Sequence, residues 1–262
     1  MLSRPIFTAS ACLPGLSPML ALKEIKKGLK EPFWGNLSFK HVQICPQNPG
    51  YMSEENVEIL KSTFSDIRLR LHANARVFPQ HQLWDASSFS QETKLYFETL
   101  AKRSKQLNAP AYSLHAGFRT NATLHQMFDN VRAIQDLFQD IPVALEGLYP
   151  NKKMPQLVDS WKEYEALLES DLYMAIDMSH LNIVAKKEGW CDDLVKALLS
   201  SSKCLEVHVS VNDGRADQHQ VAQIAPTWLP YLEVAHENAM FFSEGDQYRF
   251  ERTQLNHKKH TI

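Results

Sequence analysis

The amino-acid sequence predicts an α/β fold, a single (β/α)8 barrel. Eight short apolar runs alternate with amphipathic helical segments, a pattern typical of a parallel sheet. The length of 262 residues matches one such barrel, since these domains commonly run to about 250 residues. No Pro/Gly/Ser-rich linker divides the chain, so we expect the barrel over residues 1–250 and a polar tail over residues 251–262.

The predicted strands are short and apolar, as expected for strands that are buried on both faces. They are Pro5–Ala11, Phe39–Cys45, Ile67–His72, Ala111–His115, Val143–Glu146, Leu172–Asp177, Leu205–Val209 and Met240–Glu244. The segments between them carry apolar residues at the i, i+3, i+4 spacing of a helix that packs on a core. These predicted helices are Met19–Leu29, Glu54–Phe64, Gln91–Leu107, Leu124–Phe138, Pro155–Leu168 and Asp192–Leu199, with a weaker one at Trp228–Val234.

The composition is that of an ordinary globular protein. The formal net charge is -2, so no strong overall field favours nucleic acid, although a local basic strip is enough to follow phosphates. Four cysteines without a CxxC pair indicate reduced thiols and a cytoplasmic location. No apolar run is long enough to span a membrane, and prolines interrupt the N-terminal segment, so we expect neither membrane contact nor export.

Six of the predicted strands end on, or close to, a histidine or an acidic residue. These residues are His72, His115, Glu146, Asp177, His208 and Glu244. The carboxyl ends of the strands in a parallel barrel meet at one rim, where barrel enzymes place their sites. Partly buried carboxylates that lie together are costly unless they are paired or bind a metal ion. The strand ends therefore predict a metal centre at this rim.

Two local pairs extend the predicted centre. His180 follows Asp177 by three residues, and Asp217 and His219 alternate in the loop after the seventh strand, so that both side chains point the same way. Imidazole with carboxylate suits zinc, manganese or iron and is poor for magnesium or calcium. Nine ligands exceed what one ion uses, so we expect two or three divalent ions, with zinc favoured. The remaining histidines are interpreted as structural or solvated: His41, His81, His125, His236 and those of the tail.

These nine residues resemble the ligand set of the xylose-isomerase-like barrel superfamily, and specifically of its endonuclease IV branch, the AP endonuclease family 2. That family's trinuclear zinc site takes a His from strand three, a His from strand four, a Glu from strand five, an Asp-x-x-His at strand six, a His at strand seven, an Asp-x-His in the next loop and a Glu at strand eight. The matching positions here are His72, His115, Glu146, Asp177 with His180, His208, Asp217 with His219, and Glu244. The resemblance covers the chain from His72 to Glu244 and implies hydrolysis of a phosphoester in a small molecule or a nucleic acid.

Three reactions remain open from the sequence. In a hydrolase, carboxylates such as Glu146 bridge two ions, and Arg119 and Arg215 are candidates for phosphate contact. The sugar isomerases and epimerases of the superfamily need one ion, which corresponds here to Glu146, Asp177, His208 and Glu244, with Glu146 and Glu244 as catalytic acid and base. A third branch, whose multinuclear iron enzymes modify cysteine in peptides, has a similar site and implies a peptide substrate.

Overall fold

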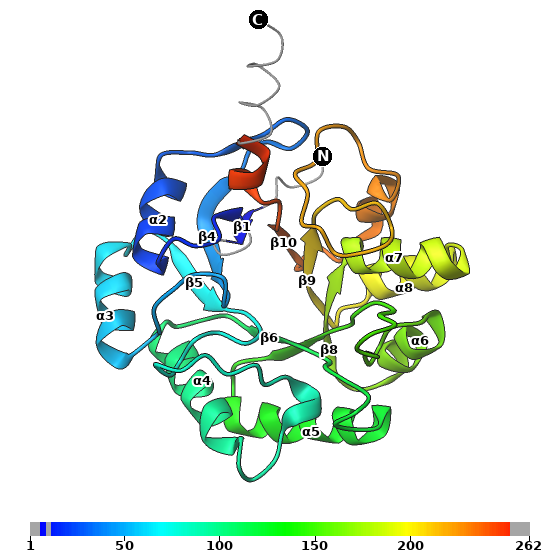
Figure 1. The fold of residues 1–262 in the computed structure, drawn as a ribbon, viewed down its shortest axis with the longest axis horizontal. Helices are drawn as coiled ribbons and strands as arrows, with labels where there is room; N and C mark the ends of the chain where they lie inside the picture. Colours follow the sequence, from blue (N-terminus) through cyan, green and yellow to red (C-terminus); the bar gives the residue numbers. More distant parts are fainter. Residues whose placement is uncertain (1–5, 9–11, 252–262) are drawn as a thin grey trace, which may run out of the picture.

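The structure, a computed structural model, describes residues 6–8 and 12–251. Eight of the described strands form one parallel sheet in the order β5-β4-β1-β10-β9-β8-β7-β6, surrounded by helices (Figure 1). The two end strands of this order meet at a bridge between His72 and Ser113, where the amide of Ala73 donates to the carbonyl of Ser113 at 2.7 Å. The α/β barrel predicted from the sequence is confirmed.

The strands lie where the sequence predicts them. Their bounds are Ile6–Thr8 (β1), Ser38–Ile44 (β4), Arg68–Leu71 (β5), Tyr112–His115 (β6), Val143–Glu146 (β7), Tyr173–Asp177 (β8), Cys204–Val209 (β9) and Met240–Ser243 (β10). The predicted first strand, Pro5–Ala11, is described only at residues 6–8. The tail predicted at residues 251–262 lies outside the described residues except for Glu251, which ends a short helical turn.

Each helix buries one apolar face against the sheet. The bounds are Pro18–Lys26 (α2), Glu54–Thr63 (α3), Lys94–Gln106 (α4), Leu124–Phe138 (α5), Trp161–Glu169 (α6), Met178–Glu188 (α7) and Asp192–Ser200 (α8). Ser53 caps the start of α3, because its side chain accepts a hydrogen bond from the backbone amide of Asn56 at 3.1 Å. Thr123 and Gln126 form a capping box at the start of α5.

The sequence prediction was wrong about residues 155–160, which are not helical. They fold back over the loop after β6, where Gln156 pairs with Phe118 and the amide of Leu157 donates to the carbonyl of Gly117 at 2.9 Å. These contacts between distant segments give the backbone partners that a helical turn would otherwise supply. Helix α6 therefore begins only at Trp161.

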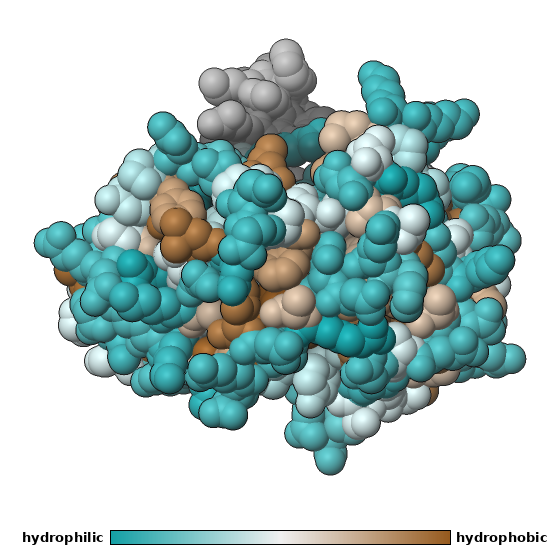
Figure 2. Space-filling model, turned by 90° about the horizontal axis from the view of Figure 1, so that it is seen from below, coloured by the Kyte–Doolittle hydropathy of each residue, from teal (hydrophilic) through white to brown (hydrophobic). Residues whose placement is uncertain are grey.

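Helix α7 was not predicted at all. It follows β8 without an intervening loop, because Asp177 is both the last strand residue and the N-cap of the helix. The weak helix predicted at Trp228–Val234 is instead the 3-10 helix η2, Leu229–Val234. Among the described residues, no helix combines the length and the apolar character needed to cross a membrane. The face of the molecule in Figure 2 is mostly hydrophilic, with hydrophobic residues gathered near its middle.

A short antiparallel hairpin, β2 (Lys30–Glu31) with β3 (Gly35–Asn36), carries a buried carboxyl group beside the last strand. Glu31 accepts hydrogen bonds from the hydroxyl of Ser243 and from the amide of Gln247, the latter at 3.1 Å. Burial raises the pKa of Glu31 to about 7, although the hydrogen bond from Ser243 acts in the opposite direction. The folded protein therefore binds a proton at Glu31 more tightly than the unfolded chain does.

This difference predicts a pH-dependent stability. The contribution of Glu31 is fully present below its ordinary pKa of 4.5 and is lost as the pH rises towards its folded pKa of about 7. Because glutamine stays neutral, Glu31→Gln is expected to stabilise the metal-free protein by up to about 3 kcal/mol at pH 8, relative to its effect at pH 5. Urea unfolding at both pH values measures this difference. The exposed Glu237→Gln variant is the control, and an equal effect of Glu31→Gln at both pH values would contradict the prediction.

Candidate metal centre

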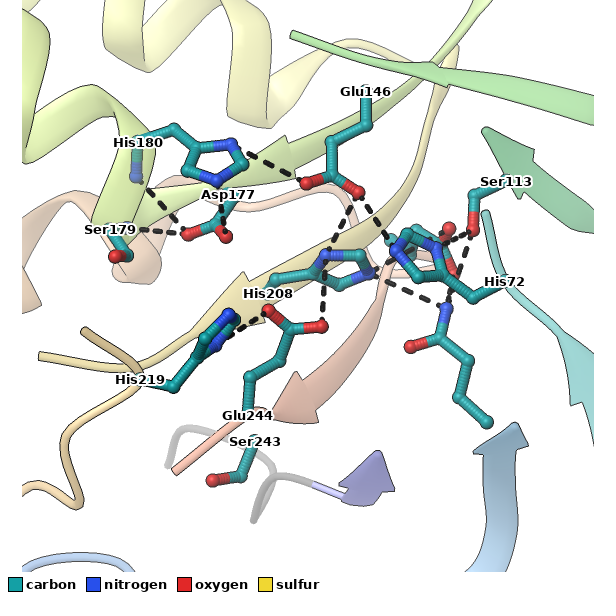
Figure 3. A network of polar contacts seen from close by, with 12 residues as sticks. His72, Ser113, Glu146, Asp177, Ser179, His180, His208, His219, Ser243 and Glu244 are labelled. Atoms are coloured by element: carbon teal, nitrogen blue, oxygen red, sulfur yellow. Dashed lines mark hydrogen bonds and ion pairs between the residues drawn. The ribbon is translucent and has the colours of Figure 1, made fainter. Parts of the chain in front are cut away.

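The strand ends and the segments that follow them bring all nine predicted ligands together at one end of the barrel. Figure 3 shows His72, Glu146, Asp177, His180, His208, His219 and Glu244 among them. Parallel register places neighbours side by side: His115 pairs with Glu146 across β6 and β7, and Asp177 pairs with His208 across β8 and β9. Glu244 directly follows β10, and its amide donates to the carbonyl of Val209 at 3.0 Å. The structure thus brings together the residues that the sequence singled out; that they bind metal stays a prediction.

Glu146 lies at the middle of the group. One carboxylate oxygen, Oε2, is 3.3 Å from Nε2 of His72 and 3.2 Å from Nδ1 of His208. The other oxygen, Oε1, is 3.4 Å from Nδ1 of His180 and 3.8 Å from Nε2 of His115. Four imidazoles from different elements therefore surround one buried carboxylate, an arrangement suited to a carboxylate that bridges two ions.

A second set of ligands lies at the start of α7. The carboxylate of Asp177 caps this helix, with Oδ1 accepting from the amide of Ser179 at 2.6 Å and from that of His180 at 3.3 Å. Its other oxygen, Oδ2, is 3.5 Å from Nε2 of His180, which is also 3.5 Å from Oδ2 of Asp217. The capping role explains the Asp-x-x-His spacing, because one turn of helix returns His180 to the carboxylate that starts the helix.

The orientation of His180 is set by the residue that follows Glu146. Nδ1 of His180 lies 2.9 Å from the carbonyl oxygen of Gly147 and donates to it, which leaves Nε2 as the nitrogen that faces Asp177 and Asp217. A side chain at Gly147 would meet the ring of Tyr164 at 2.4 Å, so glycine is required there. The Glu-Gly sequence at the end of β7 therefore serves the geometry of the site.

The third set joins the loop after β9 to the end of β10. Nε2 of His219 is 2.9 Å from Oδ2 of Asp217, as the alternating Asp-x-His spacing predicts, and its Nδ1 is 3.5 Å from Oε2 of Glu244. Oε1 of Glu244 is in turn 3.7 Å from Nδ1 of His208. Ser179 holds this loop in place by donating from its hydroxyl to Oδ1 of Asp217 at 2.9 Å. The loop ligands are thereby fixed against α7.

The donor atoms fit metal ions. Three overlapping triads place one ligand atom from each residue within 4.8 Å of the others: His72–Glu146–His208, Glu146–Asp177–His180 and Asp177–His208–Glu244. Within the described part of the chain, four of the buried donor atoms have no well-formed hydrogen bond: Glu146 Oε2, Asp177 Oδ2, His208 Nδ1 and His219 Nδ1. Buried polar atoms that lack partners are costly, and coordination of a cation would satisfy them.

The charge on Glu146 is balanced by the histidines around it. Burial raises the pKa of this carboxyl group, but His208, His115 and His72 outweigh burial and hold the pKa below its ordinary value. The pKa of His72 itself is lowered by burial, with Glu146 acting against it. In the absence of metal, His72 is therefore neutral, and the carboxylates are balanced by the histidines whose pKa is raised, namely His180, His208 and His219.

By contrast with His72, His208 and His219 hold protons. Burial lowers the pKa of His208, but Glu244 and Glu146 outweigh it and raise the pKa to about 10. The pKa of His219 is raised to about 9, because its hydrogen bond with Asp217 outweighs burial. A metal ion competes with these protons for the same nitrogen atoms, so metal binding releases protons and weakens as the pH falls.

A cavity of about 260 Å³ opens above the ligands. Its wall includes residues that the sequence did not single out, such as Cys45, Asn74, Asp85, Phe118 and Tyr149. Asp85 is buried and accepts from the hydroxyl of Ser87 at 2.6 Å, and a side chain at Gly117 would overlap it. These residues come from loops without a periodic pattern, so no local signal in the sequence marked them.

The two arginines predicted to contact substrate do not line this cavity. Arg119 forms ion pairs with Asp159 at 2.6 Å and with Glu163 at 2.7 Å, and Arg215 is exposed in its loop. Of the described residues, none that line the cavity is a lysine or an arginine. His41 and His125 are apart from the centre, as interpreted from the sequence: His41 accepts from Nε of Arg70 at 3.0 Å, and His125 lies exposed on α5.

No family model matches the sequence, and no curated protein matches it. Solved structures do share the fold. A D-tagatose 3-epimerase-like protein superposes with a TM-score of 0.69 at 13% identity, covering 98% of this chain and 96% of that one. The 3-keto-D-glucoside 4-epimerase of E. coli gives 0.61 at 15% identity over 93% and 92%, and an AP endonuclease, family 2, from Brucella melitensis gives 0.58 at 13% identity over 93% and 94%. The chain therefore shares the barrel fold of these epimerases and of this AP endonuclease, and the comparison does not single out the endonuclease.

Proposed function

We propose that the protein is a metal-dependent enzyme that hydrolyses a phosphoester at two or three divalent ions. One observation carries this proposal: the three ligand triads share Glu146, Asp177 and His208 rather than standing apart. Shared carboxylates hold neighbouring ions close together, and sites with paired ions stabilise both the attacking and the leaving oxygen of an in-line displacement. When bound, the ions supply an activated water molecule at neutral pH and neutralise the charge of a phosphoryl group.

The chain's own residues hold and orient this centre. Glu146 and Asp177 are fully enclosed, whereas the side chains of His115 and His219 are 33% and 31% exposed and face the open side. The substrate therefore approaches from the side of His115 and His219. Two exposed apolar side chains, Leu83 and Met154, also line the cavity on this side.

The cavity favours a small substrate over a nucleic-acid duplex. A volume of about 260 Å³ accommodates a molecule of roughly monosaccharide size. Tracking a nucleic-acid backbone requires lysine and arginine contacts to several phosphates, and none of the described residues that line the cavity is basic. The charge of a phosphoryl group is then compensated by the metal ions rather than by side chains.

Isomerisation or epimerisation of a small sugar is the second candidate, with one ion on Glu146, Asp177, His208 and Glu244. A specific contact favours it, because Glu146 and Glu244 both approach Nδ1 of His208, at 3.2 Å and 3.7 Å, which brings three of these four residues together around one point. Several of the solved structures that share this fold are also sugar epimerases by name. Oxidation at iron needs a redox metal, so metal identity tests it.

The variant His219→Ala separates the candidates, because it removes a ligand of the multinuclear centre and leaves the four residues of the single-ion site intact. Wild-type protein reconstituted with zinc, manganese or iron is expected to bind at least two ions per chain and to hydrolyse small phosphoesters. His219→Ala is expected to lose about one ion and roughly 100-fold in hydrolysis. The exposed His125→Ala variant is the matched control.

Elemental analysis and assays with phosphomonoesters, phosphodiesters and ketoses decide the outcome. If the wild type bound one ion per chain and its ketose epimerisation survived His219→Ala, the hydrolase proposal would be rejected and the epimerase proposal supported. If the protein acted only on a peptide thiol, and only with iron and dioxygen, both of these proposals would be rejected in favour of oxidation.

A further inference from the structure

A second polar layer lies inside the barrel, directly beneath the candidate metal centre. Arg70, Ser113 and Glu206 each stand two residues before a predicted ligand on the same strand: His72, His115 and His208 respectively. Residues two apart on a strand share a face, so these three point into the barrel interior below the ligands. All three are buried, and the proposed reaction uses none of them.

The layer is built around one ion pair. Nη1 of Arg70 donates to Oε2 of Glu206 at 2.6 Å, and its Nε donates to Nε2 of His41 at 3.0 Å. The Arg70 guanidinium also lies over the ring of Phe242, 4.9 Å from its centroid. Burial lowers the pKa of His41 to about 3, so His41 stays neutral and accepts this hydrogen bond. Arginine and glutamate thus cancel one another's charge in the interior.

Gln43 connects the ion pair to the ligands. Its amide nitrogen donates to Oε2 of Glu206 at 3.2 Å and to the hydroxyl of Ser113 at 3.3 Å, and it also lies 3.5 Å from Nε2 of His208. The Ser113 hydroxyl in turn lies 2.7 Å from Nδ1 of His72 (Figure 3). The other oxygen of Glu206, Oε1, is buried without a hydrogen bond among the described residues and lies 3.8 Å from Nε2 of His208.

We propose that Arg70, Glu206, Gln43 and Ser113 are positioning residues that hold His72 and His208 in the tautomers required for metal binding. This inference rests on the proposed metal centre. Oε1 of Glu206 faces Nε2 of His208 at 3.8 Å, beside the Gln43 amide nitrogen at 3.5 Å, and favours a proton on that nitrogen, so that Nδ1 is the nitrogen left to face Glu146 and Glu244. Ser113 accepts the Nδ1 proton of His72 and leaves the Nε2 lone pair facing Glu146. Both ligating nitrogens then point at the same carboxylate.

Geometry supports this assignment over a purely structural role. A buried ion pair alone satisfies Arg70 with one carboxylate oxygen, yet the second oxygen of Glu206 faces His208 rather than another donor. The contacts with His72 and His208 also come from different strands, β6 and β9, which β7 and β8 separate in the sheet, and they meet at Gln43 on β4. Polar residues that only packed the barrel interior would not need the Gln43 amide to connect the contacts of His72 and His208.

The test compares metal affinity with folding stability. Glu206→Gln removes the carboxylate that attracts the His208 proton, and Ser113→Ala removes one oxygen from the His72 contact. Each is expected to weaken zinc binding at the affected site by roughly 10-fold to 100-fold, measured by competition with a chelating dye. Cobalt substitution provides a second readout, because its visible spectrum reports the ligand geometry.

The double variant Arg70→Met with Glu206→Leu tests whether these residues position the metal ligands or only stabilise the fold. Replacing both members of a buried ion pair by apolar residues commonly preserves stability. We therefore expect near wild-type unfolding in urea together with weakened zinc binding and an altered cobalt spectrum. Wild-type zinc affinity in Glu206→Gln, or its recovery in the double variant, would overturn the inference. If the wild type bound no metal, the proposed function itself would fail, and the two failures are thus distinct.

Discussion

Replacing Glu146 with glutamine is expected to abolish activity, with a loss of at least about 1,000-fold, and to lower the metal content by at least one ion per chain. The carboxylate is shared by two of the three ligand triads and lies within 3.8 Å of four histidines. An amide keeps one oxygen donor and the shape of the side chain, but it loses the negative charge that two neighbouring cations require. Elemental analysis and activity assays on the same preparation measure both effects.

The size of this effect distinguishes a bridging residue from a peripheral one. Glu31→Gln is a matched control, because Glu31 is a buried glutamate that touches Ser243 and Gln247 and none of the nine ligands. It is expected to keep its metal and its activity. If Glu146→Gln kept the wild-type number of ions, the shared position of Glu146 would have no functional meaning, and the multinuclear centre would be rejected.

Removal of metal with a chelator is expected to lower the midpoint of thermal unfolding by about 10 °C. A ligand that binds only the folded state at 1,000 times its Kd stabilises by about 4 kcal/mol, and each kcal/mol shifts the midpoint of a protein of this size by about 2–4 °C. The physical reason lies in the carboxylates and histidines that are buried together at the rim. Without cations, they depend on protons for neutralisation, as the raised pKa values of His208 and His219 indicate.

Differential scanning fluorimetry with and without chelator, followed by re-addition of zinc, measures this shift. The destabilisation should be smaller at low pH, because protons then occupy the imidazoles in both forms. Glu146→Gln serves as the internal control, since it should respond less to the chelator than the wild type does. Equal midpoints for the wild type in both conditions would contradict a metal centre in the folded protein.

The sequence by itself determined the barrel fold and which nine residues lie together at its rim. Buried strands are local apolar runs, so their ends are visible without tertiary information, and histidine or carboxylate residues at those ends stand out against the apolar background. Parallel topology then converts positions such as His115 and Glu146, 31 residues apart in the chain, into neighbours. The Asp-x-His pair also forms, but not by the predicted alternation of an extended segment, because His219 has a left-handed backbone conformation with φ of 45°.

Only the tertiary structure decided what surrounds this ring. Helix α7 escaped prediction because Asp177 serves at once as strand end, helix cap and candidate ligand, and nothing local separates these roles. Arg119 was expected near substrate, but it forms ion pairs with Asp159 and Glu163, about 40 positions further on, and does not line the cavity.

Asp85 reaches the cavity on a loop whose path depends on packing against Gly117. The layer of Arg70 and Glu206 was present in the sequence as charged residues inside apolar strands, yet their pairing joins residues 136 positions apart. Such contacts arise from the closure of the barrel, and short-range periodicity carries no information about them.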